Sequence, residues 1–323
     1  MDLYSRPPGL DATRRAKVAD AGARLPVDVD GYLGLCERAA ATARGDGAPV
    51  FVAWRQKCGA IDPAELLDVA FAKSSRAFFW SSPSDGASFV AAGSACDLVG
   101  RGTTRFGQVR HARRQALSRM LHGGLPGGDT ARTPSFVGGF SFDVAQGDGS
   151  SPLPDALMWL PSVVVGRDDD DCTLTLHARV GPDDRIDRAD AANAIARLVA
   201  ALAATGGRTD DRRSDPGHVS MVDRPDSREW AALVDAAQHR VRREKLDGIA
   251  VSRQLELISS RRFDVASALR FLARRDPAVT VFGCRVGDGA FLGATPQRLA
   301  GLRRGKVRAT SLTGTTARGE TSE

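Results

Sequence analysis

The chain has 323 residues, of which 42% are hydrophobic and 26% charged, and its 45 basic and 39 acidic side chains give a formal net charge of +6. This composition predicts a globular protein with enough apolar material for a sizeable core. The basic residues form no compact block interleaved with aromatic side chains, so we expect no nucleic-acid partner. No apolar run approaches membrane-spanning length, so we also expect no membrane partner.

The cysteines are few and scattered. There are five, without a Cys-x-x-Cys pair: Cys36, Cys58, Cys96, Cys172 and Cys284. An odd number at irregular spacing predicts neither a zinc site nor a disulfide framework, and favours a reducing compartment. The first residues also lack the apolar core of a secretion signal. Together these features predict a cytoplasmic protein.

Hydrophobic periodicity predicts alternating strands and helices through the first two thirds of the chain. Helices are expected at 27–43, 62–71, 108–121 and 187–204, and strands at 49–54, 76–80, 87–93, 134–142, 158–165 and 172–177. Residues 11–24 are charged and alanine-rich and are expected to form an arm or a short helix. Four carboxylates follow one another at 168–171, but consecutive turn residues cannot all face one ion, so a solvated turn is predicted there.

A polar connection at 205–224 divides the chain into two predicted lobes, 1–204 and 225–323. Ser227 is placed to cap a helix that stops near Gly248. A strand at 249–253, a helix after Asp264 and a hairpin of 278–286 with 290–293 are expected to follow. We find no internal repeat.

The last stretch carries two glycine turns, Phe291-Leu-Gly-Ala-Thr-Pro-Gln-Arg-Leu299 and Ser311-Leu-Thr-Gly-Thr-Thr-Ala-Arg-Gly319, with a strand expected at 307–312. Gly293 and Gly314 allow the backbone to approach a neighbour closely, because glycine has no Cβ. Thr295, Thr313, Thr315 and backbone N–H groups would offer neutral hydrogen-bond donors to a small anion. The alternative is that these are two ordinary β-turns.

Both segments resemble those of the chorismate-utilising enzymes, in which a Gly-Ala-(Ser/Thr)-Pro-Glu turn precedes an Ala-Leu-Ala-Gly-Thr-x-x-Arg-Gly segment. The aromatic hairpin at 76–93 and the Pro-Ser-Phe-Val-Gly-Gly-Phe-Ser-Phe segment at 134–142 resemble the isochorismate synthase branch. The resemblance implies the α/β (α+β) chorismate-utilising fold, with large packed β-sheets and helices outside. Alternating strands and helices are compatible with that fold but do not specify it.

The resemblance also implies chorismate as the substrate, Mg²⁺ as the cofactor, and Gly293, Ala294, Thr295, Thr313, Gly314 and Thr315 as substrate-binding residues. The family base, a lysine, corresponds to Gly248, and the family acid, a glutamate, corresponds to Gln297. Glycine cannot accept a proton, and an amide donates a hydrogen bond but delivers no proton at neutral pH. Lys245 is a weak substitute for the base, three residues before Gly248.

The metal-binding glutamates of the family would lie beyond Glu323, so no metal ligand is assigned to this chain. We therefore expect a fold that is incomplete at the C-terminus. Two readings stay open. One is an isochorismate synthase-like enzyme of menaquinone or siderophore supply, with impaired or no activity. The other is a non-catalytic, truncated relative that binds or interacts, or a decaying reading frame. The sequence specifies no protein partner.

Overall fold

The computed structural model describes residues 27–125, 136–144, 153–203, 217–276, 278–303 and 305–311. The chain divides into two compact units, residues 1–210 with 268–323 and residues 211–267. The sequence pattern groups 268–323 with 225–267 instead, and that lobe assignment stays a prediction. The expected arm at 11–24 lies outside the described residues. Within them, no helix combines the length and the apolar character that crossing a membrane requires.

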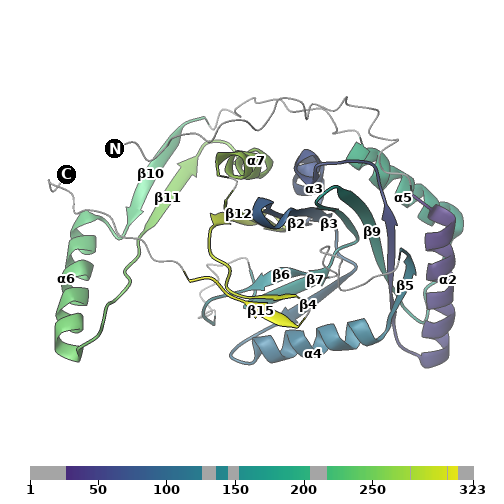
Figure 1. Cartoon of the computed structure of the whole chain (residues 1–323), viewed down its shortest axis with the longest axis horizontal. Coiled ribbons are helices and arrows are strands. Elements are labelled where there is room, and N and C mark those ends of the chain that lie inside the picture. The colour runs from purple at the N-terminus through teal and green to yellow at the C-terminus, as the bar shows by residue number, and fades with distance from the viewer. Residues whose placement is uncertain are drawn as a thin grey trace. The chain divides into compact units, whose positions relative to one another are not determined.

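The larger unit is built on an eight-stranded sheet in the order β13-β12-β2-β3-β8-β9-β1-β5 (Figure 1). The strands are β1 (Val50–Lys57), β2 (Arg76–Ser82), β3 (Ala87–Ala92), β5 (Met120–Gly124), β8 (Val163–Asp168), β9 (Asp171–Val180), β12 (Thr280–Val286) and β13 (Gly289–Thr295). Neighbours pair antiparallel except β1 and β5, which are parallel. Because β12 pairs with β2, the C-terminal hairpin extends the sheet formed by the N-terminal half.

A second sheet of three strands packs against the inner face of the first. It consists of β4 (Cys96–Gly100), β7 (Ala156–Leu160) and β6 (Val137–Phe140), with β7 in the middle. The core between the sheets includes Phe78, Val137, Trp159 and Val164, all at most 8% exposed. Alternation along each strand produces this core, because every second side chain points to the same face.

Helices cover the outer faces of the two sheets (Figure 1). They are α2 (Val29–Asp46), η2 (Pro63–Leu66), α3 (Leu67–Lys73), α4 (Arg105–Ser118) and α5 (Arg188–Ala203). The apolar stripe of α2 packs on Val52 of β1 and Val180 of β9. Helix α4 contributes Val109 and Ala116 to a cluster with Leu160 of β7. A short η3 (Pro83–Asp85) joins β2 to β3, and β14 (Gly301–Arg303) pairs with β15 (Lys306–Arg308).

The smaller unit contains β10 (Val219–Arg224), α6 (Ser227–Glu244) and β11 (Gln254–Ser259), and β10 pairs antiparallel with β11. Asp226 and Glu229 form a capping box at the start of α6, so the cap is Asp226 rather than the predicted Ser227. Helix α7 (Val265–Arg275) crosses the boundary between the two units. From Ala268 onward it belongs to the larger unit, where the fully buried Leu269 lies against Gly283 of β12.

The fold class is confirmed, and so are the hairpins β2–β3, β8–β9 and β12–β13. Two predicted elements differ from the elements observed. The helix predicted at 108–121 ends at Ser118, because Met120 begins a strand that pairs with Phe51. The strand predicted at 158–165 is divided between the two sheets at Pro161, which has no N–H to donate to a strand ladder.

Two predictions in the smaller unit are corrected. The predicted polar connection at 205–224 contains a strand, β10, and the predicted strand at 249–253 lies outside any strand. The cause is strand pairing. Residues 219–224 of β10 pair with residues 254–259 of β11, so β11 begins one residue after the end of the strand predicted at 249–253. A β-branched run becomes a strand only where a partner lies beside it.

Candidate functional site

The first glycine segment begins inside the edge strand β13, which contains Gly293, Ala294 and Thr295, and the chain turns only after Thr295. Gly293 lies opposite Phe282 of β12, and a Cβ on Gly293 would be 2.9 Å from Cζ of that ring. The absence of a side chain therefore lets the Phe282 ring lie over the strand. Ala294 and Gln297 are exposed at the end of β13. The close approach predicted for Gly293 is thus made to a side chain of the same sheet.

Thr295 closes the turn with its own hydroxyl group. The backbone N–H of Gln297 donates a hydrogen bond to Oγ1 of Thr295 at 3.1 Å. The Thr295 hydroxyl group in turn donates to the Gln297 carbonyl oxygen at 3.5 Å. Threonine side chains commonly stabilise turns in this way. The hydroxyl that the sequence offers to an anion therefore has a structural contact as well.

Arg298 is a residue of this turn that the sequence analysis missed. Its Nη2 forms an ion pair with Asp85 in η3, and 34% of the Arg298 side chain is exposed. Asp85 also accepts a hydrogen bond of 2.9 Å from Ser82, whose hydroxyl oxygen lies 3.3 Å from that of Thr280. The turn is thereby held to the tip of the β2–β3 hairpin. The only sequence feature that could have indicated a role for Arg298 is its position directly after Gln297.

The predicted base positions belong to the smaller unit. Lys245 ends α6 in the left-handed conformation (φ 51°), and its backbone N–H donates to the Val241 carbonyl group. Its side chain is exposed. Gly248 is also exposed, and a Cβ placed there meets no heavy atom within 4 Å. Within its unit, Gly248 can therefore accept a side chain without a clash.

Thr313, Gly314 and Thr315 lie outside the described residues. Among the residues that the structure does describe, His, Cys, Asp and Glu form no group of three or more that could hold a metal ion. Because no such group is found there, no described residue is assigned to Mg²⁺, and we derive no chemical step through it.

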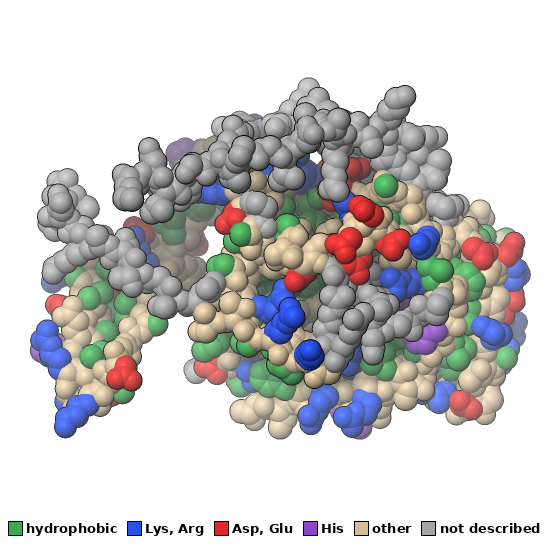
Figure 2. All heavy atoms as spheres, in the orientation of Figure 1, with side chains coloured by type: hydrophobic (Ala, Val, Ile, Leu, Met, Phe, Trp, Pro, Cys, Tyr) green, Lys and Arg blue, Asp and Glu red, His purple; other side chains and the backbone are tan. Residues whose placement is uncertain are grey.

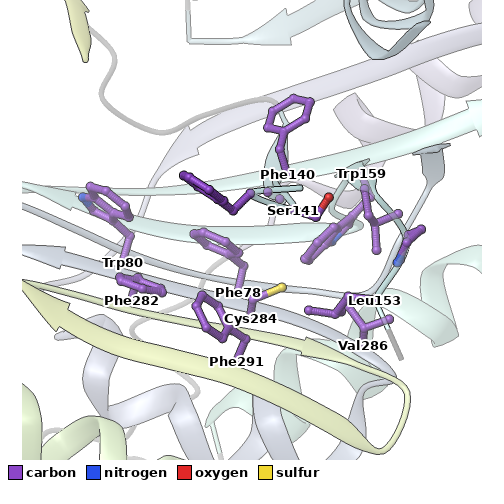
Figure 3. Close-up of a pocket in the computed structure, with 15 residues that line it drawn as sticks. Phe78, Trp80, Phe140, Ser141, Leu153, Trp159, Phe282, Cys284, Val286 and Phe291 are labelled. Carbon is purple, nitrogen blue, oxygen red and sulfur yellow. The ribbon is translucent and has the colours of Figure 1, made fainter. Parts of the chain in front are cut away.

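A pocket of about 560 Å³ lies between the two sheets of the larger unit (Figure 3). Aromatic rings from five strands line it: Phe78 and Trp80 of β2, Phe140 of β6, Trp159 of β7, Phe282 of β12 and Phe291 of β13. None of the described residues that line it carries a formal charge. A dicarboxylate such as chorismate would lose its hydration here without gaining a charged partner. The pocket is therefore distinct in chemistry from the turn at 293–298.

Charges lie elsewhere on the larger unit. On the face shown in Figure 2, Asp and Glu side chains gather in the upper middle with Lys and Arg beside them, and further Lys and Arg side chains lie along the lower edge. Charges of both signs therefore share this face.

Comparison with known proteins agrees with the motifs. The family described as chorismate binding enzyme matches residues 37–323. The salicylate biosynthesis isochorismate synthase of Pseudomonas aeruginosa is 26% identical over 292 residues, which are 88% of this chain and 58% of that protein. An isochorismate synthase of Bacillus subtilis is 22% identical over 282 residues, covering 85% of this chain and 58% of its own length.

Solved structures show the same fold. The menaquinone-specific isochorismate synthase of Escherichia coli superposes with a TM-score of 0.54 at 17% identity, over 83% of this chain and 56% of that one. A protein assigned as a 2,3-dihydroxybenzoate-specific isochorismate synthase of Bacillus anthracis gives 0.50 at 17% identity, over 80% and 54%. The chain thus spans 58% of the length of the curated relatives it matches.

Because the family match extends over most of its length, the chain belongs to the chorismate binding enzyme family. The resemblance drawn from the two glycine turns and the aromatic strands is confirmed at this level. Both curated relatives are named isochorismate synthases, and the roles of individual residues in this chain stay predictions.

Proposed function

We propose that this chain is a chorismate-binding protein of the isochorismate synthase type, in which the turn at 293–298 forms part of the substrate site. Family membership and the names of both curated relatives support the substrate. The observation that carries the assignment is the turn itself. It leaves Ala294 and Gln297 exposed at a strand end, and the next residue in sequence, Arg298, pairs with Asp85.

The chemistry of the turn suits a carboxylate-bearing ligand. The amide of Gln297 and the hydroxyl of Thr295 are neutral donors, and Arg298 adds a cation to the same segment of the chain. Asp85 neutralises part of that charge and orients the guanidinium group. Such an arrangement would hold an anion by hydrogen bonds and orientation rather than by a large excess of positive charge.

We further propose that catalysis by these residues is impaired. Isomerisation of chorismate to isochorismate moves a hydroxyl group between ring carbons, which requires a base that activates water and an acid that protonates the departing hydroxyl. Gly248 offers no base, and Gln297 offers no acidic proton. Each missing group costs roughly 10²- to 10⁴-fold in rate. Lys245 is the substitute base that we propose to test.

In the relatives, we expect Mg²⁺ to neutralise the ring carboxylate when bound. Since no described residue of this chain fits that role, substrate binding by this chain is proposed to depend on its own donors. The product would be isochorismate for menaquinone or siderophore supply in an active relative. For this chain, binding without efficient turnover is the function we propose.

Isothermal titration of the full chain with chorismate tests the assignment. We expect saturable binding that Gln297→Ala weakens several-fold, because the variant loses one donor and exposes the turn. The matched control is Gln115→Ala, the same change at an exposed position of α4, which should leave binding unchanged. Absence of binding, or equal affinity in both variants, would contradict the placement of the site.

A further inference from the structure

The apolar pocket between the sheets has a defined structural origin in β6. Gly138 adopts φ 145°, and a Cβ there would lie 2.1 Å from the Leu157 carbonyl oxygen, so the close pairing of β6 with β7 requires glycine. Gly139 differs, because a Cβ there meets no atom within 4 Å. By alternation, Gly139 shares the face of Val137, which packs in the core between the sheets. Gly139 is itself exposed, so the missing side chain at 139 leaves open space beside the buried Leu157 with which it pairs.

Flat ring surfaces bound this space. Phe282 and Phe291 lie with their centroids 5.6 Å apart, and Phe78 meets the edge of Trp159 at 6.0 Å (Figure 3). Trp159 is fully buried, whereas Phe291 is 57% exposed. The pocket thus runs from the buried core between the sheets to the exposed edge strand. Aromatic walls of this kind favour offset stacking or edge contacts with another ring.

The polar groups in the lining are few and uncharged. Ser141 and Cys284 are the lining residues with a polar or sulfur-containing side chain besides the tryptophans. Burial raises the pKa of the Cys284 thiol to about 11, so the thiol is neutral at physiological pH. A charged ligand would find no counter-ion among the described lining residues, whereas a neutral ring system would lose little on leaving water.

We propose that this pocket binds a neutral, planar aromatic molecule of two or three rings, at a site separate from the turn at 293–298. The volume of about 560 Å³ lies in the range of small-molecule sites and exceeds what a single benzene ring fills. The proposal rests on the lining of the pocket and does not depend on chorismate binding.

The test is a fluorescence titration of the full chain with N-phenyl-1-naphthylamine, a neutral probe whose emission rises in apolar surroundings. We expect saturable binding in the micromolar range, with energy transfer from Trp80 and Trp159 to the probe. Naphthalene should displace the probe, whereas 1-naphthoate, which adds a carboxylate to the same rings, should compete at least tenfold more weakly.

Variants of β6 locate the site. Gly139→Phe should weaken probe binding at least tenfold by filling the space, and Gly139→Ala should weaken it to a smaller degree. The matched control is Gly34→Phe on α2, where an added Cβ also meets nothing within 4 Å; it should leave binding unchanged. If Gly139→Phe fails to fold, the proposal is tested by the Gly139→Ala variant and by the competition between naphthalene and 1-naphthoate.

Three results would overturn the proposal. They are the absence of saturable binding, unchanged affinity in a folded Gly139→Phe variant, and equal competition by naphthalene and 1-naphthoate. The last result would indicate general adsorption to exposed apolar surface rather than a pocket that excludes charge.

Discussion

Arg298 and Asp85 form an ion pair that ties the turn after β13 to the tip of the β2–β3 hairpin. The two residues are far apart in sequence, and they meet because β12 pairs with β2 in the same sheet. Asp85 is also held by the Ser82 hydroxyl group at 2.9 Å. The geometry of the proposed substrate turn therefore depends on a hairpin from the N-terminal half of the chain.

A double-mutant cycle on this pair should detect a modest coupling. With Arg298→Met and Asp85→Asn, we expect a coupling free energy of unfolding of about 0.5–1 kcal/mol, because both side chains are about one third exposed and solvent screens the pair. The matched control is the more exposed pair Lys57–Asp171, with side chains 68% and 70% exposed, where coupling should be near zero. Urea denaturation measures both cycles. Equal coupling in the two pairs would argue against a positioning role for Arg298.

Gly293 should be intolerant of a methyl group. Gly293→Ala places a Cβ 2.9 Å from the Phe282 ring, so we expect a loss of about 1–3 kcal/mol in the free energy of unfolding. Gly107→Ala, within α4 and with open space around the new Cβ, should be neutral or stabilising.

Replacing the Phe282 ring tests whether contact with that ring causes the loss of stability in Gly293→Ala. In the Gly293→Ala background, Phe282→Leu should cost less stability than it does alone, because the smaller side chain relieves the contact. Chemical denaturation of the four variants provides the comparison. If Gly293→Ala were as stable as Gly107→Ala, the close approach at Gly293 would be refuted.

His177 should make stability depend on pH. Burial lowers its pKa to about 4, with the Pro161 carbonyl at 2.8 Å from Nδ1 opposing the shift and His122 adding to it. The unfolded chain, with a histidine pKa near 6.5, binds more protons than the folded chain between these values. The contribution of neutral His177 to the free energy of unfolding is therefore complete above about pH 6.5. It is lost as the pH falls toward 4, by up to roughly 3 kcal/mol.

The His177→Gln variant isolates this effect, since an amide can still donate to the Pro161 carbonyl group. We expect its free energy of unfolding to change less between pH 7 and pH 4 than that of the parent chain. His111→Gln, at an exposed position of α4, should retain the parental slope. Identical slopes in the parent and His177→Gln would show that His177 does not titrate between the two states as described.

Local pattern predicted much of the larger unit. The helix at 29–46 follows from its apolar stripe, and the β2–β3 hairpin follows from aromatic strands around a Pro-Ser-Asp-Gly turn. Both signals act within a few residues. The strand β5 was missed, because it exists through parallel pairing with β1, which the local pattern of Met120 to Gly124 does not reveal.

The candidate site was predicted only in part, for the same physical reason. Gly293, Ala294, Thr295 and Gln297 were proposed because their motif is contiguous in sequence, and their roles in binding stay predictions. The ion pair of Arg298 with Asp85 and the pocket beside Gly139 join distant segments, and neither has a local signature. Gly248 and Lys245 were placed by resemblance alone, and their relation to the turn stays a prediction.

The rate of chorismate consumption, followed in the presence of Mg²⁺, tests the central claim most directly. We predict that the parent chain binds chorismate but turns it over far more slowly than enzymes typically do, because Gly248 and Gln297 supply neither base nor acid. Gly248→Lys with Gln297→Glu should raise the rate. Lys245→Ala tests the substitute base, because any residual turnover that depends on the Lys245 amine is lost in this variant. Turnover by the parent chain at rates typical of enzymes, with median kcat on the order of 10 per second, would contradict the proposed loss of catalysis.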